Sequence, residues 1–335
     1  MTGVQTLTVE ENEADLRLDR WFKQRFPNVT HGRLQKLLRT GQIRVDGGRV
    51  KSSTRLQLGQ TVRIPPLGDA VKEKPKRKRP AAGPSKEDAE AIQAWVLHRD
   101  KHIIVLNKPA GLAVQGGSGT KRHIDGMLDA LRFDAEERPR LVHRLDRDTS
   151  GVLLVARTAK AARVMGESFK SKQTRKLYWG LVVGVPRPSH GVIDMPLAKL
   201  PGKRGERMVA DDDEGKRAVS VYRVLETAGR KVAWLAIEPI TGRTHQIRVH
   251  VADGLETPIL GDGKYGGQEA FLEGDGIARQ VHLHARSVRV PHPAGGFLEV
   301  SAPMPEHMER TCRTLGLIAD EEYDQFSDLE GLGLA

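Results

Sequence analysis

Apolar residues recur every three or four positions in the first part of the chain, which is the spacing of helices with one buried side. Two helices are predicted, one beginning at Asp15 and one over residues 31–39. Their apolar positions are Leu16, Leu18, Trp21 and Phe22 in the first helix and Leu34, Leu37 and Leu38 in the second. Gly41 ends the second helix, and a short strand then enters an Asp46-Gly47 turn. We therefore predict a small folded module over residues 1–65.

A second and longer region of apolar patterning extends over residues 93–315. Short apolar or alternating runs predict strands, and apolar residues at helical spacing predict helices. The predicted strands cover residues 95–98, 103–106, 152–156, 175–184, 219–225, 231–240, 283–286 and 288–293, and the predicted helices cover residues 121–132 and 158–170. Residues 246–249 are compatible with a helix or with a continuation past a bend. The polar segment 196–217 is predicted to be an exposed hairpin or loop.

Two polar segments separate or follow these regions. Residues 66–92 contain the run Val71 to Pro80, which has six basic residues and one acidic residue. Such a segment buries too little apolar surface to fold alone, so we predict a basic flexible linker, which is either a solubilising spacer or a phosphate-binding segment. Residues 316–335 contain six acidic residues and no basic one, and are predicted to be a frayed acidic tail.

Composition narrows the classes of partner and compartment. The 335 residues include 54 Lys and Arg against 43 Asp and Glu, a formal net charge of +11. A basic excess favours an acidic partner, most commonly nucleic acid, although it also serves solubility. The single Cys312 excludes a disulfide framework. No apolar stretch is long enough to span a membrane, and the N-terminus has no apolar signal core, so we expect a cytoplasmic protein without a membrane partner.

The most chemically crowded segment lies just before the predicted strand at residues 152–156. Within six residues it holds two carboxylates, two guanidinium groups and one imidazole, namely Asp146, Asp148, Arg144, Arg147 and His143. A carboxylate held beside fixed cations stays ionised at neutral pH, which suits a nucleophile or a base. The alternative interpretation is an ion-paired surface loop, because structural ion pairs also gather charges.

The order of these residues resembles a family signature. His-Arg-Leu-Asp-x-x-Thr-Ser-Gly, from His143 to Gly151, is similar to the signature of the RluA family of pseudouridine synthases, and is closest to its RluC branch. Three further segments resemble motifs of the same family: Asn107 to Gly111, Lys176-Leu-Tyr178, and Thr241 to His250. The resemblance implies that Asp146 is the catalytic residue and that Asn107 to Gly111 support its loop.

The resemblance also implies roles for other residues. Tyr178, which spacing alone assigns to the core, would lie against the target uracil, and Arg248 would pair with Asp146. Leu283 would lie under the base, and Arg243 is a phosphate-contact or structural candidate. From adjacency to Asp146 alone, Arg144 or Arg147 would fill the space that a flipped uridine vacates. His245 and His250 lack a third metal ligand with suitable spacing, so we predict hydrogen-bonded structural histidines.

The N-terminal module resembles the alpha-L RNA-binding fold, which a small-subunit ribosomal protein shares. The resemblance rests on Arg17-Leu-Asp and on the stretch from Gly41 to Gly47. It implies an RNA-docking domain in which exposed basic residues gather on one surface. These residues are Arg33, Lys36, Arg39 and Arg44. Taken alone, such residues are more often a solvated helix face.

Together, the resemblance implies an α+β fold with a central, mostly antiparallel mixed sheet and flanking helices, plus the small N-terminal domain. The implied reaction converts uridine to pseudouridine in large-subunit ribosomal RNA or its assembly intermediate, by base flipping and with no cofactor or metal. We expect a monomer. Asp146 would be either the nucleophile at the ribose or the base that starts glycal formation. A non-catalytic ribosome-binding protein, and a metal-dependent ribonuclease using Asp146 and Asp148, remain as alternatives.

Overall fold

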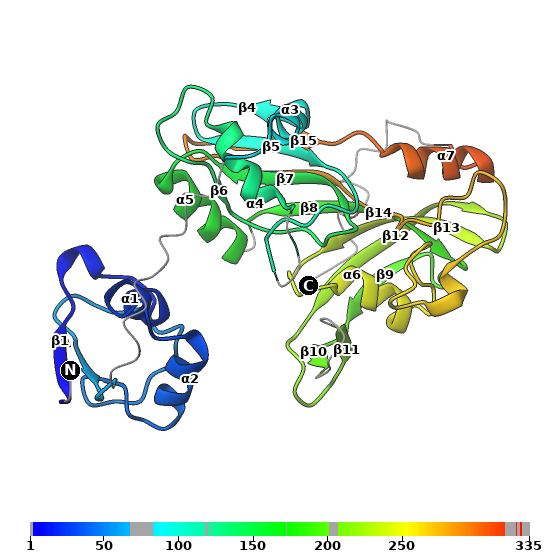
Figure 1. Ribbon diagram of the computed structural model, residues 1–335. Helices are drawn as coiled ribbons and strands as arrows, with labels where there is room; N and C mark the ends of the chain where they lie inside the picture. The colour runs from blue at the N-terminus through cyan, green and yellow to red at the C-terminus, as the bar shows by residue number, and fades with distance from the viewer. Residues whose placement is uncertain are drawn as a thin grey trace. The chain divides into compact units, whose positions relative to one another are not determined.

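The computed structural model describes residues 3–67, 83–117, 120, 122–171, 173–200, 207–318, 326 and 329. The chain divides into two compact units, residues 1–82 and residues 83–335 (Figure 1). Each unit contains its own sheet and its own buried clusters. Within the described ranges, no helix has both the length and the apolar character needed to cross a lipid bilayer.

The N-terminal unit packs two helices on a three-stranded antiparallel sheet of order β1-β3-β2. Its elements are β1 (Gln5–Thr8), the 3-10 helix η1 (Glu11–Glu13), α1 (Leu18–Arg25), α2 (His31–Arg39), β2 (Arg44–Val45) and β3 (Thr61–Ile64). The predicted apolar positions Leu18, Trp21, Phe22, Leu34 and Leu38 form its core. The predicted bounds of the second helix are confirmed, and the Thr30 hydroxyl caps it by accepting from the Arg33 amide.

The first helix starts later than predicted. Asp15 has a left-handed backbone with φ of 64°, which cannot belong to a right-handed helix. The Leu18 amide donates to the Thr54 carbonyl at 2.8 Å, so the chain before Leu18 is held by the neighbouring loop and not by a helical turn. Leu16 nevertheless packs against the core, as the apolar pattern predicted.

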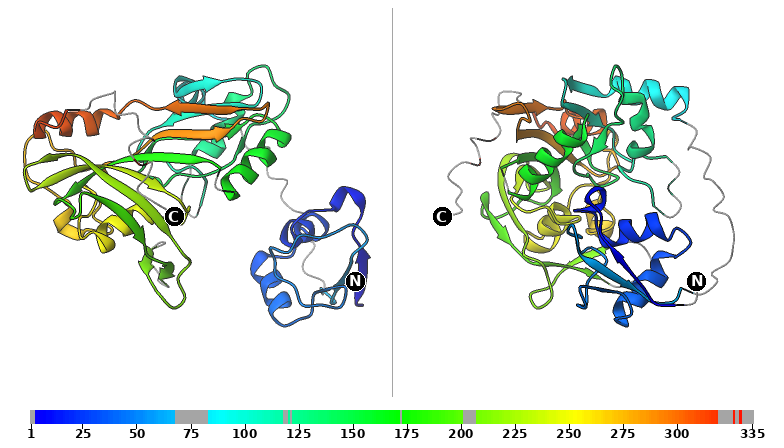
Figure 2. Two further views of the ribbon diagram at one scale, coloured as in Figure 1. Left: turned by 180° about the vertical axis from the view of Figure 1, so that it is seen from behind. Right: turned by 90° about the vertical axis from the view of Figure 1, so that its left-hand side faces the viewer.

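The C-terminal unit is built on a ten-stranded sheet of order β4-β5-β7-β14-β8-β13-β12-β9, with β6 paired to β7 and β15 paired to β14. The strands are β4 (Val96–Arg99), β5 (Ile103–Lys108), β6 (Arg140–Leu141), β7 (Ser150–Ala156), β8 (Arg175–Val183), β9 (His190–Asp194), β12 (Val219–Ala228), β13 (Val232–Pro239), β14 (Leu283–Pro291) and β15 (Phe297–Ser301). Only β7 and β14 pair in parallel among these described strands. The predicted α+β fold with a mostly antiparallel mixed sheet is confirmed. Figure 2 shows β14 and β15 side by side, both in orange.

Helices cover both faces of this sheet, and a separate hairpin extends from it. The helical segments are α3 (Lys86–Ala94), α4 (Ile124–Met127), η2 (Leu128–Leu131), α5 (Ala159–Lys170), α6 (Gln246–Val249), the π-helix η3 (His250–Gly254), η4 (Gly267–Ala270) and α7 (Glu306–Leu315). The hairpin consists of β10 (Leu197–Leu200) and β11 (Arg207–Ala210), within the segment predicted to be a hairpin or loop.

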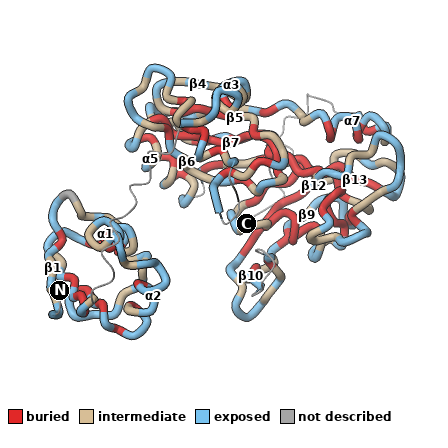
Figure 3. Tube along the Cα trace, in the orientation of Figure 1, coloured by how far each residue is buried: buried red, intermediate tan, exposed pale blue. Residues whose placement is uncertain are grey.

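Strand β7 is buried along its whole length because both of its faces are covered (Figure 3). Leu153 and Val155 point into a cluster formed with α3, α4 and η2. Val152 and Leu154 point into the opposite cluster, which includes Met165 of α5. The continuous apolar run in the sequence therefore reflects a strand in the middle of three layers.

Gly151 allows β7 to approach β14 at the one parallel junction. Its φ is 104°, and an added Cβ atom would lie 2.2 Å from the Ala285 carbonyl oxygen. A side chain at this position would therefore collide with the backbone of β14. Next to it, Ser150 Oγ lies 2.8 Å from His284 Nδ1 inside the core. This junction fixes the loop that precedes β7 against the centre of the sheet.

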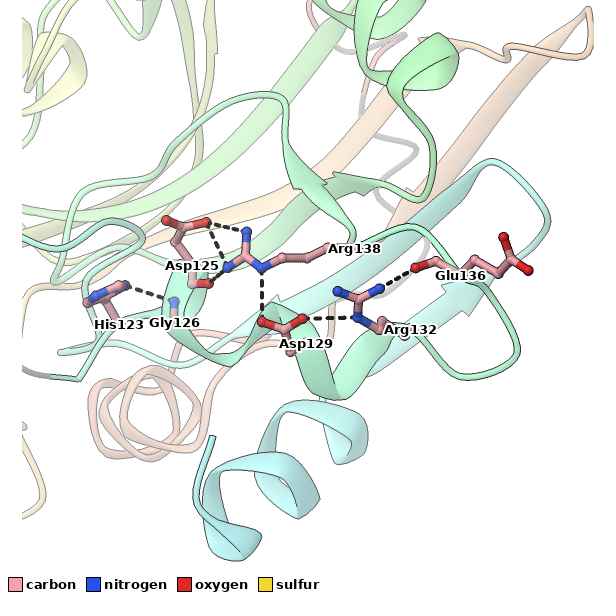
Figure 4. Close-up of polar contacts among 7 residues, drawn as sticks. All are labelled: His123, Asp125, Gly126, Asp129, Arg132, Glu136 and Arg138. Atoms are coloured by element: carbon pink, nitrogen blue, oxygen red, sulfur yellow. Dashed lines mark hydrogen bonds and ion pairs between the residues drawn. The ribbon is translucent and has the colours of Figure 1, made fainter. Parts of the chain in front are cut away.

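The helix predicted over residues 121–132 is shorter and changes type. Four residues form α4, and the next four form the 3-10 helix η2. Figure 4 shows the contacts around this change: Arg138 donates to the Asp125 main-chain carbonyl, and Asp129 accepts from Arg132 and Arg138, each at 3.0 Å. His123 accepts from the Gly126 amide and caps the start of α4. Side chains thus form hydrogen bonds with backbone groups that would bond to one another within a longer helix.

The predicted linker and tail also differ from the structure at their ends. Helix α3 occupies the last part of the predicted linker, and the Ser85 hydroxyl caps it by accepting from the Asp88 amide at 3.2 Å. In the predicted frayed tail, Leu317 packs in the cluster under α7, and Phe326 and Leu329 are buried against β8, β12 and β13. The basic run from Val71 to Pro80 lies outside the described residues.

Candidate active site

The loop before β7 is held by a buried lysine from the preceding motif. Lys108 has no exposed surface, and its Nζ atom donates to the carbonyls of Pro109 at 2.8 Å, Leu112 at 2.7 Å and Arg147 at 3.0 Å. Burial lowers the pKa of Lys108 to about 7, and the charges of Asp148 and Asp146 oppose this shift. These contacts link the segment from Asn107 to Gly111 to the Asp146 loop and support its predicted structural role.

His143 completes the hydrogen bonding of β7. Its Nε2 atom accepts from the Leu154 amide at 2.8 Å, and its ring stacks on Phe169 with centroids 4.8 Å apart. Burial, assisted by the positive charge of Lys176, lowers the pKa of His143 to about 3. The imidazole is therefore neutral at pH 7 and serves as an acceptor for the strand.

Two basic side chains approach the carboxylate of Asp146. Arg248 NH1 lies 3.8 Å from Asp146 Oδ2, and His245 Nε2 lies 3.9 Å from Asp146 Oδ1. The Asp146 side chain remains 20% exposed, whereas the Arg248 side chain is only 6% exposed. One side of the carboxylate therefore faces the buried Arg248 guanidinium, and the other side is accessible to solvent. This arrangement brings together Asp146 and Arg248, as predicted.

Arg248 is held most tightly by Asp262. Its Nε and NH2 atoms donate to the two Asp262 carboxylate oxygens at 2.6 Å and 2.7 Å, and Asp262 is 1% exposed. Burial lowers the pKa of Arg248, but the hydrogen bonds and charges of Asp262, together with the charge of Asp146, more than compensate and raise it. The bidentate pair fixes the guanidinium plane, and its third nitrogen is left to face Asp146.

His245 lies in the same site and is hydrogen-bonded to a tyrosine. Its Nδ1 atom is 2.6 Å from the Tyr265 hydroxyl, and its backbone is left-handed with φ of 54°. Burial lowers the pKa of His245, with the Asp146 charge opposing. The predicted hydrogen-bonded state is correct, and the structure adds that this histidine faces Asp146. His250 is fully buried and bonds the Met195 carbonyl at 3.2 Å, as expected for a structural histidine.

A cavity of about 650 Å³ opens in front of Asp146. Tyr178 of β8 and Leu283 of β14 line it together with His245 and Arg248. Burial, with the Asp146 charge, raises the pKa of Tyr178, so its hydroxyl stays protonated at neutral pH. The volume lies within the range of sites for small organic ligands, and polar groups converge on one apolar wall.

The side chain of Gln246, which lines this cavity, both accepts and donates hydrogen bonds. Its side-chain oxygen accepts from the Thr241 hydroxyl at 2.6 Å and from the Arg243 main-chain amide at 3.0 Å. Its amide nitrogen donates to the Val219 carbonyl at 2.8 Å and to the Ser220 hydroxyl at 2.9 Å. These bonds attach the turn that begins at Thr241 to β12, and Arg248, the third residue of α6, faces Asp146.

Comparison with known proteins places this site in a family. The model of the RNA pseudouridylate synthase family matches residues 102–253, which include the Asp146 loop, Tyr178 and Arg248. The ribosomal large subunit pseudouridine synthase C of Vibrio vulnificus is 36% identical over 319 residues, covering 94% of this chain and 97% of that protein. The chain belongs to the RNA pseudouridylate synthase family. The corresponding synthase C of Escherichia coli strain K12 is also 36% identical, over 93% of this chain and 97% of that protein.

A plant relative and a solved structure agree with this family. RNA pseudouridine synthase 4, mitochondrial, of Arabidopsis thaliana is 34% identical, over 88% of this chain and 78% of that protein. The solved structure of human RNA pseudouridylate synthase domain containing 4 aligns with a TM-score of 0.58 at 32% identity, covering 68% of this chain and 95% of that chain.

The predicted RNA-binding arginines of the C-terminal unit line two different cavities. Arg144 and Arg243 are exposed and line the Asp146 cavity, and Arg243 Nε donates to the Arg217 carbonyl at 3.0 Å. Arg147 lines an adjoining cavity of about 350 Å³, and its Nε donates to the Gly111 carbonyl at 3.0 Å. Asp148 also lines that second cavity.

The predicted basic residues of the N-terminal unit are all exposed. Arg33 donates to the Leu67 carbonyl at 2.5 Å, and Arg44 donates to the carbonyls of Gly41 and Gly47, each at 3.1 Å. Arg39 and Lys36 extend from α2. Two of the arginines therefore also stabilise loops of their own unit, which the sequence pattern did not indicate.

The sequence analysis assigned no role to two charged groups of the site. Asp262 lies in a glycine-rich loop, and its separation of 14 residues from Arg248 gives no local signal of pairing. Lys176 precedes Tyr178 by two residues and lines the cavity as well. Strand periodicity predicts that these two side chains share a face, and this signal was available in the sequence. Among the described residues, no group of three or more His, Cys, Asp or Glu side chains is arranged to hold a metal ion.

Proposed function

We propose that this protein converts uridine to pseudouridine in RNA, and that its substrate is large-subunit ribosomal RNA, either free or in an assembly intermediate in the cytoplasm. Family membership and the large-subunit synthases that cover nearly the whole chain support this assignment. The formal charge of +11 supports an RNA partner. Apart from that RNA, we expect the protein to act as a monomer.

The observation that carries the proposal is the position of the Asp146 carboxylate at the cavity of about 650 Å³. Arg248 approaches it from the buried side, and Tyr178 forms part of the same wall. A single carboxylate that is oriented by a fixed cation and faces an aromatic ring suits attack on a nucleoside held against that ring.

In the proposed reaction the bond between ribose C1′ and uracil N1 breaks, and the base rotates and rejoins through C5. Asp146 acts either as a nucleophile at C1′ or as a base that removes the C2′ proton. Arg248 orients the carboxylate, and Tyr178 stacks on the base, a contact worth about 1–3 kcal/mol. The target nucleotide leaves its stack at a cost of a few kcal/mol, which contacts with the protein offset.

The exposed cations have a different proposed role. Arg144 and Arg243 line the Asp146 cavity and Arg147 lines the adjoining one, where they would contact phosphates or fill the space left by the flipped nucleotide. Arg33, Lys36 and Arg44 would dock the N-terminal unit, residues 1–65 in our proposal, on RNA. Phosphate contacts of this kind give affinity without sequence information.

Tritium release tests this proposal. Ribosomal RNA labelled at C5 of uracil is incubated with the protein, with and without EDTA, both as naked RNA and as a large-subunit precursor particle. C5 loses its hydrogen when it becomes the glycosidic carbon, so we expect tritium in the solvent and intact RNA. RNA that binds the protein without releasing tritium to the solvent would indicate a non-catalytic RNA-binding protein. RNA cleavage that EDTA prevents would indicate a metal-dependent ribonuclease.

A further inference from the structure

A second cation lies inside the Asp146 cavity. Lys176 is in β8, two residues before Tyr178, and side chains at this spacing point to the same face of a strand. Both residues line the cavity, and both are partly buried. The aliphatic stem and ammonium group of Lys176 are therefore directed into the same space as the aromatic ring.

No direct partner of the Lys176 ammonium group is found among the described residues. The negative charge of Glu238 in β13 acts on it, but the Glu238 carboxylate is bound by Arg175 at 3.0 Å and 2.8 Å. Within the described part of the chain, Lys176 makes no side-chain hydrogen bond or ion pair. His143 also faces it and is neutral at pH 7, and Tyr178 on the same strand face stays protonated because burial raises its pKa. Burial lowers the pKa of Lys176 to about 8, with Glu238 opposing.

A buried, unpaired cation is costly unless a ligand satisfies it. We propose that Lys176 is a further catalytic residue, whose ammonium group donates a hydrogen bond to a carbonyl oxygen of the uracil and stabilises the negative charge of the detached ring. This inference rests on the proposed function and specifies how the same cavity would hold the leaving base.

Depth in the cavity favours the base over a phosphate as the ligand. Arg144 and Arg243 also line the cavity, and both are exposed, so they can reach the phosphates of the backbone. Lys176 lies on the same face as Tyr178, which is assigned to the base. The Lys176 ammonium group would therefore contact the edge of a uracil ring that lies against Tyr178.

The charge balance of the reaction calls for such a group. When the C1′–N1 bond breaks, its electron pair stays with the uracil and spreads to O2 and O4. C1′ is then bonded to Asp146, or the sugar has lost its C2′ proton to Asp146. On rejoining, C5 forms the bond to C1′, the C5 proton leaves, N1 gains a proton, and Asp146 returns to its starting form. Lys176 transfers no proton and stabilises the charge only while it exists.

Lys176→Met tests this assignment, because it removes the charge and keeps the unbranched chain. We would measure single-turnover loss of the original nucleoside, after digestion of the RNA, on substrates with uridine or 5-fluorouridine at the target. Fluorine stabilises the uracil anion, so its departure depends less on the lysine. We expect about a 100-fold lower rate with uridine and a markedly smaller reduction with 5-fluorouridine. Lys231→Met, an exposed lysine outside the cavity, is the matched control.

Equal rates for Lys176→Met and the wild type would overturn the inference and leave the proposed function intact. Equal reductions on both substrates, together with weaker RNA binding, would also overturn it by assigning Lys176 to a phosphate. If the wild-type protein left both nucleosides unchanged, the proposed function itself would fail. If Lys176→Met is unfolded, the pH dependence of the wild-type rate tests the inference instead. The rate should fall as the pH rises through about 8, because the ammonium group then loses its proton. A rate that stays constant through that range would reject the role of the ammonium group.

Discussion

The basic residues of the N-terminal unit and Arg248 of the C-terminal unit carry positive charge in opposite ways. In the N-terminal unit Arg33, Lys36 and Arg44 are exposed, and their hydrogen bonds, where present, go to main-chain carbonyls. In the C-terminal unit Arg248 is almost fully buried and forms a bidentate ion pair with Asp262. The first group presents its charge to solvent, whereas Arg248 uses its charge to orient a carboxylate.

This difference suggests that the exposed charges determine RNA affinity and that the buried ion pair determines the rate of the reaction. Exposed charges are screened by salt and tolerate small movements, so they suit contact with a flexible phosphate backbone. A buried pair is rigid, and it becomes costly when one partner is lost because the other charge remains desolvated. We therefore expect substitutions in the two units to affect different measurable quantities.

The largest effect on stability is expected from Asp262→Asn. It leaves the Arg248 guanidinium buried with only Asp146 nearby, so we expect the free energy of unfolding to fall by about 3 kcal/mol. Activity should fall as well, because Arg248 loses its orientation. Urea unfolding of the full chain measures the first effect, and tritium release measures the second.

Asp194→Asn is the matched control for this experiment. Asp194 pairs with Arg217 at 2.9 Å, but the side chains are 45% and 67% exposed. Such a pair contributes about 0–1 kcal/mol. If the two substitutions destabilised the protein equally, the contrast between buried and exposed charge in our account would be wrong.

Acid should weaken the C-terminal unit first. Burial lowers the pKa values of His250 and His282 to about 4 and those of His143 and His284 to about 3. The unfolded chain binds protons near pH 6.5, so the folded unit loses stability as the pH falls from 6.5 towards 4. The loss is at most about 1.4 kcal/mol per histidine and pH unit.

The N-terminal unit should respond only at lower pH. Its one histidine, His31, is exposed, whereas hydrogen bonding to Arg25 lowers the pKa of Glu13 to about 2. The stability that Glu13 provides is complete above pH 4.5 and is lost as the pH falls towards 2. Hydrogen exchange, read separately for each unit at pH 7 and pH 5, measures this. Loss of protection in the N-terminal unit alone at pH 5 contradicts the prediction.

The smallest effect is expected from Lys36→Gln. Removing one phosphate contact should weaken RNA binding and reduce the slope of log affinity against log salt by about 0.7–0.9. The single-turnover rate at saturating RNA should stay unchanged, because Lys36 belongs to the proposed docking surface and not to the cavity. Binding titrations at several salt concentrations test this, and an unchanged slope would remove Lys36 from that surface.

Local pattern predicted much of the fold. The continuous apolar run of β7 and the helical spacing in α2 and α5 each reflect burial that the sequence itself encodes. Side chains that replace backbone hydrogen bonds were not predictable in this way. Arg138 and Asp129 interrupt the helix expected over residues 121–132, and the left-handed backbone of Asp15 delays α1.

The candidate site was predictable where a motif is contiguous and not where it is assembled in three dimensions. Asp146, Tyr178 and Arg248 each lie in a recognisable segment, and the structure brings them to one cavity. The strongest contact of Arg248 is with Asp262, in a separate loop, and the packing of Phe326 against β8 comes from a segment predicted to be frayed. Only the folded sheet brings such residues together.

The most direct test of the central claim compares the wild-type protein with Asp146→Asn in one single-turnover tritium-release experiment. The substitution removes the charge at nearly constant shape, and RNA binding is measured in parallel. Our account predicts release by the wild type, a rate reduced by at least about 10³-fold in Asp146→Asn, and nearly equal RNA affinity. Comparable release by both proteins would contradict the claim that Asp146 carries the reaction.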